Sequence, residues 1–169
     1  MKTTGNTILI TGGTSGIGLG LAERFHQAGN TVIVAGRRKD LLDQIAADHD
    51  GIETLVLDVT DPASIADAVD TVTAAHPELN VLINNAGIML PENLLDPASA
   101  SVAEQTVATN LLGPIRMTAV FLPLLVAKPE AAIMNVSSGL AFVPLPLDDF
   151  LDEAMAILAA DPDAREILR

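Results

Sequence analysis

Short apolar runs alternate with longer segments of mixed polarity over the first four-fifths of the chain. Five of these runs are rich in β-branched residues and leucine, and they cover residues 7–10, 31–34, 54–57, 81–83 and 132–136. Each run is brief and apolar on both faces, which is typical of strands buried between two layers of helices. The pattern therefore predicts a parallel sheet of about five strands.

The segments between these runs have helical periodicity. Residues 17–28 and 40–48 carry apolar side chains three and four positions apart. A third helix should begin after Asp61–Pro62, because aspartate caps a helix and proline suits its first turn. A longer helical stretch covers residues 99–127, with a bend expected near Gly113–Pro114. Strands that alternate with helices predict right-handed βαβ units and an α/β fold.

The pattern changes after Ser138. Residues 143–147 read Val-Pro-Leu-Pro-Leu, a poor sequence for a helix or a central strand. Residues 148–160 then predict an amphipathic helix, and Asp161–Pro162 should start a short last helix. The apolar side of the first of these helices carries Phe150, Leu151, Ala154, Met155, Ile157 and Leu158. We expect a domain over residues 1–143, with residues 144–169 as a Pro-rich turn and acidic helical tail packed on it.

The amino-acid composition excludes several classes of function. The 169 residues suit one domain, and 49% apolar with 18% charged residues indicates a globular protein. No continuous apolar run approaches the ~18 residues of a membrane span, so we expect a cytoplasmic protein with no membrane partner. The absence of cysteine excludes thiolate catalysis and zinc–thiolate sites. A net charge of −13 argues against nucleic acid as a partner.

A glycine-rich turn follows the first predicted strand directly, and a helix follows the turn. It reads Thr11-Gly12-Gly13-Thr14-Ser15-Gly16-Ile17-Gly18. Gly12 permits a tight turn, Gly16 lets the backbone approach a pyrophosphate, and Gly18 lets helix and strand pack closely. A plain loop could have the same composition, but the position between strand and helix favours dinucleotide binding. The cofactor contacts predicted here are Gly12, Thr14, Ser15, Gly16, Ile17 and Gly18.

Three cations follow the second predicted strand: Arg37, Arg38 and Lys39. Sites for NAD usually place an acid here for the ribose 2′-hydroxyl, whereas arginine accommodates a 2′-phosphate. A solvated basic turn at the start of a helix is the alternative. We predict that NADP(H) is preferred over NAD(H), with Arg37 and Arg38 on the 2′-phosphate through bidentate hydrogen bonds.

The spacing of Gly12, Gly16 and Gly18 resembles the fingerprint of the short-chain dehydrogenase/reductase family. Asp58–Val59 resembles that family's adenine-contacting pair, and residues 84–87 resemble its Asn-Asn-Ala-Gly motif. The resemblance implies that Asn85, Ala86 and Gly87 border the cofactor. It also implies a Rossmann-like, doubly wound sheet with strand order 3-2-1-4-5.

Two further motifs give candidate catalytic residues by the same resemblance, which covers residues 5–143. Asn110 matches the helix asparagine that holds a water in the proton relay, and Ser138 matches the serine that orients the substrate. Taken singly, Asn84 and Asn110 could be buried amides and Ser138 a strand-end cap. Four motifs in the family's order make the resemblance specific.

The family's proton-transfer pair has no counterpart in this chain. The resemblance requires a tyrosine about a dozen residues after the serine and a lysine four residues later, where Leu151 and Met155 stand. The chain has no tyrosine, and its lysines are Lys2, Lys39 and Lys128. From Leu147 onward the sequence resembles the acidic tail of a longer family member. The resemblance therefore implies that two strand–helix units of the family, roughly 45–60 residues, have no counterpart here, and we expect a seam near Pro146–Leu147. A natural deletion, an engineered one or an absent segment would each give this result.

Two functions remain open. The first is an NADP(H)-dependent oxidoreductase that interconverts a small-molecule carbonyl and alcohol by hydride transfer. The second is a catalytically dead NADP-binding module or structural remnant. General-base catalysis by His26, His49 or His76 is disfavoured, because these residues fall in predicted helices away from the carboxyl edge of the sheet. Their spacing also predicts no metal site.

The resemblance bears on assembly as well, since family members commonly pair through the long helix after the fourth strand. Six apolar residues of that region need a cover: Val107, Leu111, Ile115, Val120, Leu124 and Leu125. Either the 148–160 helix covers them or a homo-oligomer buries them through the 99–127 region.

Overall fold

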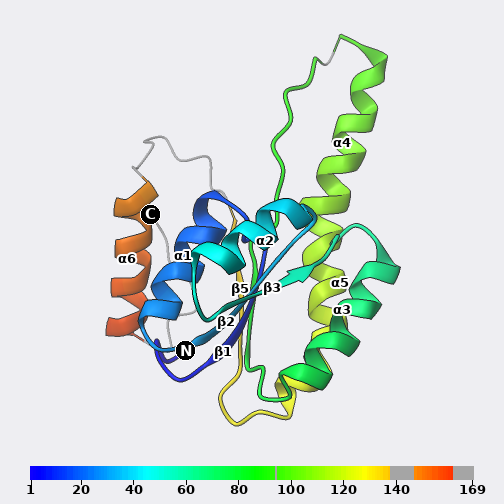
Figure 1. Cartoon of the computed structure of the whole chain (residues 1–169). Helices are drawn as coiled ribbons and strands as arrows, with labels where there is room; N and C mark the ends of the chain where they lie inside the picture. Colours follow the sequence, from blue (N-terminus) through cyan, green and yellow to red (C-terminus); the bar gives the residue numbers. More distant parts are fainter. Residues whose placement is uncertain (94, 138–146, 162–169) are drawn as a thin grey trace.

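Five parallel strands form a single sheet in the order β3-β2-β1-β4-β5. The structure is a computed structural model that describes residues 1–93, 95–137 and 147–161 (Figure 1). The strands are β1 Thr7–Thr11, β2 Thr31–Gly36, β3 Ile52–Val56, β4 Val81–Asn84 and β5 Ala132–Asn135. The order confirms the predicted Rossmann-like sheet, with its chain reversal between β1 and β4.

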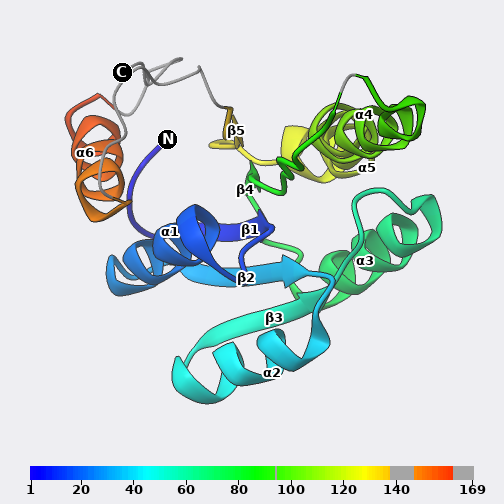
Figure 2. The ribbon, with the colours of Figure 1, turned by 90° about the horizontal axis from the view of Figure 1, so that it is seen from above.

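Helices cover both faces of the sheet, as Figure 2 shows. One face carries α1 Gly16–Gln27, α2 Lys39–Asp48 and α6 Leu147–Ala160. The opposite face carries α3 Pro62–Ala75 and α5 Gly113–Val126, which continues α4 Ala100–Val107. Alternate strand residues supply the two cores, so that Ile8 and Ile10 face α1 while Leu9 faces α5. All three are fully buried.

The two edge strands differ from the prediction. β3 runs from Ile52 to Val56, so it begins two residues before the predicted run 54–57 and ends one residue before the end of that run. Both β3 and β5 are only partly buried, so the expectation of strands buried on both faces is wrong for them. Each has a neighbouring strand on one side among the described residues, which leaves its other edge less covered.

The long helical stretch is interrupted by a π-helical turn, Ala108–Leu112, between α4 and α5. The backbone N–H of Gly113 donates to the carbonyl of Ala108, five residues earlier. The interruption therefore lies just before Gly113–Pro114, close to the expected bend. It widens the helix at residues that border the site described below.

The stretch Ala100–Val126 has the length and composition to cross a membrane, with a mean hydropathy of 1.4 over its most apolar window. No continuous apolar run was expected there, and the average is reached across interspersed polar residues. Its inner side packs on the sheet through Met117, Phe121 and Leu125. That packing is what the core helix of an α/β layer requires.

Helix α6 docks on α1. A Cβ on Gly20 would overlap the Leu151 side chain, so the glycine makes room for α6. Arg24 of α1 pairs with Asp152 at 2.8 Å and with Asp148 at 3.2 Å. The hydrogen bond to Asp152 raises the pKa of the Arg24 guanidinium above its ordinary value. The acidic helix is thus anchored to α1 and not solvated along its whole polar face.

The position of α6 rules out one predicted cover for the 99–127 region, because α6 lies on the opposite face of the sheet (Figure 2). Val107, Leu111 and Ile115 remain about half exposed. Leu125 needs no cover, since it is buried in the α5 core. The predicted last helix and the 143/144 domain boundary lie outside the described residues, and the seam near Pro146–Leu147 lies at their margin.

Candidate functional site

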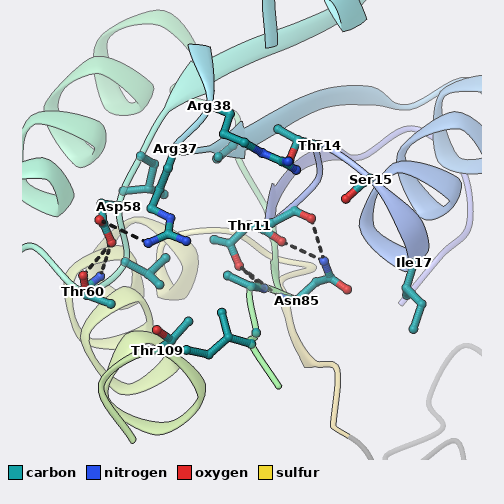
Figure 3. A pocket seen from close by; sticks show the side chains of 18 residues that line it. Thr11, Thr14, Ser15, Ile17, Arg37, Arg38, Asp58, Thr60, Asn85 and Thr109 are labelled. Carbon is teal, nitrogen blue, oxygen red and sulfur yellow. Dashed lines mark hydrogen bonds and ion pairs between the residues drawn. The ribbon is translucent and has the colours of Figure 1, made fainter. Parts of the chain in front are cut away.

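A cavity of about 380 Å³ opens at the carboxyl ends of the strands, where the paired strands β1 and β4 end (Figure 3). Parallel α/β sheets bind ligands where the strand order reverses, and this cavity lies at that point. Its lining residues are Thr11, Gly12, Thr14, Ser15, Ile17, Ala35, Gly36, Arg37, Arg38, Leu57, Asp58, Val59, Thr60, Asn85, Ala86, Gly87, Ile88 and Thr109. Eleven of the predicted cofactor contacts are among them; Gly16 and Gly18 are not.

The glycine turn is packed so tightly that side chains would not fit. Gly12 has a φ of +65°, and a Cβ there would lie 2.7 Å from the Cα of Ala86. A Cβ on Gly18 would overlap the Gly12 carbonyl and the Asn85 amide. Gly18 therefore permits contact between α1 and the turn itself, and not only between helix and strand. Gly16 has a φ of +57° with nothing within 4 Å of its Cβ position, which leaves backbone open to a ligand.

Thr11 and Asn85 join the ends of β1 and β4 beneath the cavity. The side-chain amide of Asn85 donates to the carbonyls of Thr11 at 3.0 Å and Gly12 at 3.1 Å. The Thr11 hydroxyl accepts from the backbone N–H groups of Asn85 and Ala86. These hydrogen bonds hold the β1–α1 turn against the segment after β4, and both segments supply residues that line the cavity.

Ser15 precedes α1 at its N-cap position, with an extended backbone (φ −169°). Its side chain makes no capping hydrogen bond and lines the cavity, so its hydroxyl faces the ligand space. The first N–H groups of a helix and its positive dipole end favour an anion at this place. The turn and the helix start together fit a phosphate-bearing ligand.

Two arginines from the β2–α2 turn border the other side of the cavity. Arg38 Nη2 donates to the Thr14 hydroxyl at 3.2 Å, and Arg37 Nη1 lies 4.0 Å from Asp58 Oδ2. Lys39, the third cation of the run, instead pairs with Asp43 at 2.6 Å and does not line the cavity. Two of the three cations therefore line the cavity, and Figure 3 shows both side chains.

Asp58 is oriented by its neighbours. Its Oδ1 accepts from the Thr60 backbone N–H at 2.8 Å and from the Thr60 hydroxyl at 2.7 Å. Oδ2 is thereby turned toward Arg37. The same loop is held against α5, since Arg116 donates to the Thr60 carbonyl at 3.1 Å. Gly113 lets Val59 approach closely, because a Cβ there would lie 2.9 Å from a Val59 methyl.

The candidate catalytic residues are only partly described. The Asn110 side chain accepts from the backbone N–H of Ile88 and donates to its carbonyl, both at 2.8 Å, and thereby fixes the segment after β4. Asn110 does not line the cavity, whereas Thr109 does. Ser138 lies outside the described residues.

The histidines lie away from the cavity, as predicted. His26 is in α1, while His49 and His76 end α2 and α3. His49 lies 3.5 Å from Glu23, and His76 lies 2.9 Å from Glu53. Over the described part of the chain, no group of three or more His, Asp or Glu side chains could hold a metal ion.

Among the described residues, the sequence did not predict seven that line the cavity: Thr11, Ala35, Gly36, Leu57, Thr60, Ile88 and Thr109. Most of them adjoin a residue that was predicted. Thr60 had a usable signal, because a threonine two positions after an aspartate favours a local side-chain hydrogen bond. Thr109 had none, since the π-helical turn that presents it leaves no local pattern.

Comparison with known proteins agrees with this geometry. A family profile described as short chain dehydrogenase matches residues 6–148. The chain is 40% identical over 146 residues to the uncharacterized oxidoreductase DltE of Bacillus subtilis, covering 86% of this chain and 58% of that protein. It is 33% identical over 144 residues to the short chain dehydrogenase/reductase dpmpG of Macrophomina phaseolina, covering 81% of this chain and 82% of that protein.

Among solved structures, the closed form of serine dehydrogenase complexed with NADP⁺ superposes with a TM-score of 0.73 at 29% identity. The match covers 90% of this chain and 62% of that one. The chain thus spans less than two thirds of the length of both DltE and serine dehydrogenase. With its sheet order, its glycine turn and the family profile in agreement, the chain belongs to the short-chain dehydrogenase family.

Proposed function

We propose that this chain binds NADP(H) in the cavity at the carboxyl ends of β1 and β4 and is the cofactor-binding part of an oxidoreductase. The observation that carries the proposal is the pair Arg37 and Arg38 on the cavity wall, with no acid at the end of β2. An arginine pair suits a 2′-phosphate, while an acid would suit the 2′-hydroxyl of NAD(H). The structural neighbour whose complex contains NADP⁺ supports the same choice.

Each side of the cavity suits one part of the cofactor. The turn at Gly12 and Ser15, with the start of α1, would hold the pyrophosphate. Asp58 and Val59 would contact the adenine. The segment from Asn85 to Gly87 would border the dinucleotide, and the bound nicotinamide supplies hydride exchange with a carbonyl or alcohol.

Turnover needs more than this cavity. Carbonyl reduction requires a proton donor beside the substrate oxygen, and the family's tyrosine has no counterpart among the 169 residues. We propose that the 169-residue chain binds NADP(H) without turning over a substrate. The alternative is oxidoreductase activity in a longer protein that contains the tyrosine, with Ser138 orienting the substrate and Asn110 organising a water.

The test is calorimetric titration of the chain with NADPH and NADH. We expect NADPH to bind more tightly, and Arg37→Ala to weaken it by about 5- to 30-fold while NADH changes less than twofold. This range follows from charge-assisted hydrogen bonds of ~1.5–3 kcal/mol, reduced because the Arg37 side chain is 63% exposed. Lys39→Ala is the matched control and should bind NADPH like the wild type.

Two outcomes would contradict the proposal. Equal affinities for NADPH and NADH would refute the cofactor preference, as would equal effects of the Arg37 and Lys39 substitutions. NADPH oxidation at 340 nm with small aldehydes or ketones would refute the claim that this chain has no turnover. A blank assay together with tight NADPH binding is the result that we expect.

We further propose a homo-oligomer in the cytoplasm, with no nucleic acid or membrane partner. The outer side of the 99–127 region leaves large apolar side chains exposed, among them Leu111 and Ile115 at 55% and Val126 at 70%. Burial of such a patch favours self-association. Light scattering after size exclusion should give a mass of two chains or more, and a clean monomer would count against the oligomer. Flotation with lipid vesicles should leave the protein unbound.

A further inference from the structure

The outer edge of β5 carries backbone groups that face away from the rest of the sheet. The N–H groups of Ala132 and Val136 donate to carbonyls on the β4 side, both at 2.9 Å. Backbone direction alternates along a strand, so Ile133 and Asn135 turn their N–H and C=O groups to the opposite edge. Among the described residues no strand lies beyond β5. An open edge of this kind is a template for pairing with another chain.

The sequence of β5 does not protect this edge. Proteins commonly place charged residues or proline on an edge strand to prevent pairing with other chains. Residues 132–136 read Ala-Ile-Met-Asn-Val and contain neither. The strand at the other end of the sheet, β3, carries Glu53, which pairs with His76. In a chain with a net charge of −13, two copies can therefore meet at β5 without placing like charges opposite each other.

Exposed apolar side chains on α5 lie next to this edge. Ile115 and Leu122 are 55% and 43% exposed, and about two helical turns separate them. With Thr118 between them they form one side of the helix, which we call the α5 stripe. Arg116 marks a different side, because it reaches the Thr60 carbonyl next to α3. In Figure 2 α3 lies toward β3 and α5 toward β5, so the α5 stripe is on the side of the open edge.

A twofold axis perpendicular to the sheet would bring both features together in two copies. Neighbouring strands are about 4.8 Å apart. Helix α5 contacts β4 and β5, so in a sheet continued through β5 two strand spacings, about 9.6 Å, would separate α5 from its copy. Packed helices have axes about 8–10 Å apart. Pairing of the β5 strands would therefore place the two α5 stripes in contact over the joint.

We propose that two copies of this chain pair their β5 strands antiparallel and pack their α5 stripes over the joint, so that one sheet continues through the dimer. The inference rests on the proposed homo-oligomer and names its contact surface. Ile133 of one copy would exchange backbone hydrogen bonds with Asn135 of the other, and Met134 would lie opposite its own copy. The same surface serves both copies, as a closed dimer requires.

The experiment introduces one cysteine, because the chain has none of its own. In the proposed pairing Met134 faces its copy across a non-hydrogen-bonded pair, where the Cα atoms are about 4.5 Å apart. A disulfide spans Cα distances of about 4.4–6.8 Å. Under mild oxidation Met134→Cys should therefore link most chains into dimers that a reducing agent separates. Val56→Cys, at a 53% exposed position of β3, is the matched control and should stay unlinked.

A second variant tests the α5 stripe without changing the strand. Ile115→Lys should weaken self-association by about tenfold or more in light scattering over a range of concentrations, because each dimer loses two buried isoleucines. Val56→Lys should associate like the wild type.

The outcomes separate this inference from the proposed function. An oligomer that Met134→Cys does not link, or that Ile115→Lys leaves unchanged, would overturn the β5 pairing while the homo-oligomer stands. A wild-type monomer would refute both. Calorimetric titration of the same samples with NADPH tests cofactor binding, which does not depend on the β5 edge.

Discussion

Gly12 and Gly16 give a direct test of how the cavity is built, because they share a backbone conformation but differ in surroundings. Their φ angles are +65° and +57°, and alanine in this left-handed region costs about 1–2 kcal/mol at either position. At Gly12 the added Cβ would also lie 2.7 Å from the Ala86 Cα, which cannot rotate away. Overpacking against backbone adds about 1–3 kcal/mol. Gly16 has open space. Gly12→Ala should therefore lower the free energy of unfolding by about 2–5 kcal/mol, and Gly16→Ala should lower it by about 1–2 kcal/mol.

The assay is urea unfolding of both variants beside the wild type, followed by thermal unfolding. The expected difference of about 1–3 kcal/mol between them corresponds to a gap of about 2–12 °C in the unfolding midpoint for a chain of this length. Gly16→Ala serves as the control for backbone strain. Equal losses would show that strain alone accounts for both glycines. The close contact between the β1–α1 turn and the segment after β4 would then be wrong.

Three smaller predictions follow from other contacts. Leu151→Ala should lose about 2–5 kcal/mol in urea unfolding, because Leu151 is 1% exposed against α1; a loss below about 1 kcal/mol would mean that α6 is not docked there. Asp61→Ala should lower the free energy of unfolding by about 1 kcal/mol, because the Asp61 side chain caps α3 by accepting from the Ala63 N–H. Asp67→Ala, at an exposed position of the same helix, is the control and should be near neutral in the same measurement. Asn85→Ala should lose about 1–3 kcal/mol, because two backbone carbonyls lose their side-chain donor; a wild-type denaturation curve would contradict this.

The order of elements could be predicted from periodicity because each element has a strong local signal. The α3 start shows this well, since Asp61 caps the helix and Pro62 begins it as expected. The bounds of β3 could not be predicted as well. Its ladder with β2 pairs Ile52 with Val32, and this pairing extends the strand backward into polar sequence. Tertiary pairing thus overrode the apolar run that defined the prediction.

The packing of α6 on α1 also could not be predicted from the local sequence. An amphipathic pattern says that one side of a helix is buried, but it does not say against what. Here the docking position of α6 is set by the space beside Gly20, which has no side chain, and by the ion pairs of Arg24 with Asp148 and Asp152. Those partners are more than a hundred residues apart in the chain.

The glycine turn and the two arginines could be predicted because each motif consists of consecutive residues in the sequence. The place of Thr109 on the cavity wall could not be predicted, because it depends on the π-helical turn at Ala108–Leu112. Pro114 explains part of that turn, since it has no N–H to donate to the carbonyl of Asn110. The helix is interrupted one turn earlier than the proline, and the sequence alone does not reveal that offset.

The described lining of the cavity comes from the part of the chain before β5. Of the residues that the structure describes, those that line the cavity lie between Thr11 and Thr109, in the first four strand–helix units and the π-helical turn. The hydrogen bonds that fix Asp58 and Asn85 come from this same region. Helix α6 meets α1 through Gly20 and Arg24, on the face away from α5. The proposed binding of NADP(H) therefore depends on described residues that the missing tyrosine does not touch. The proposed affinity and the proposed lack of turnover each need their own measurement.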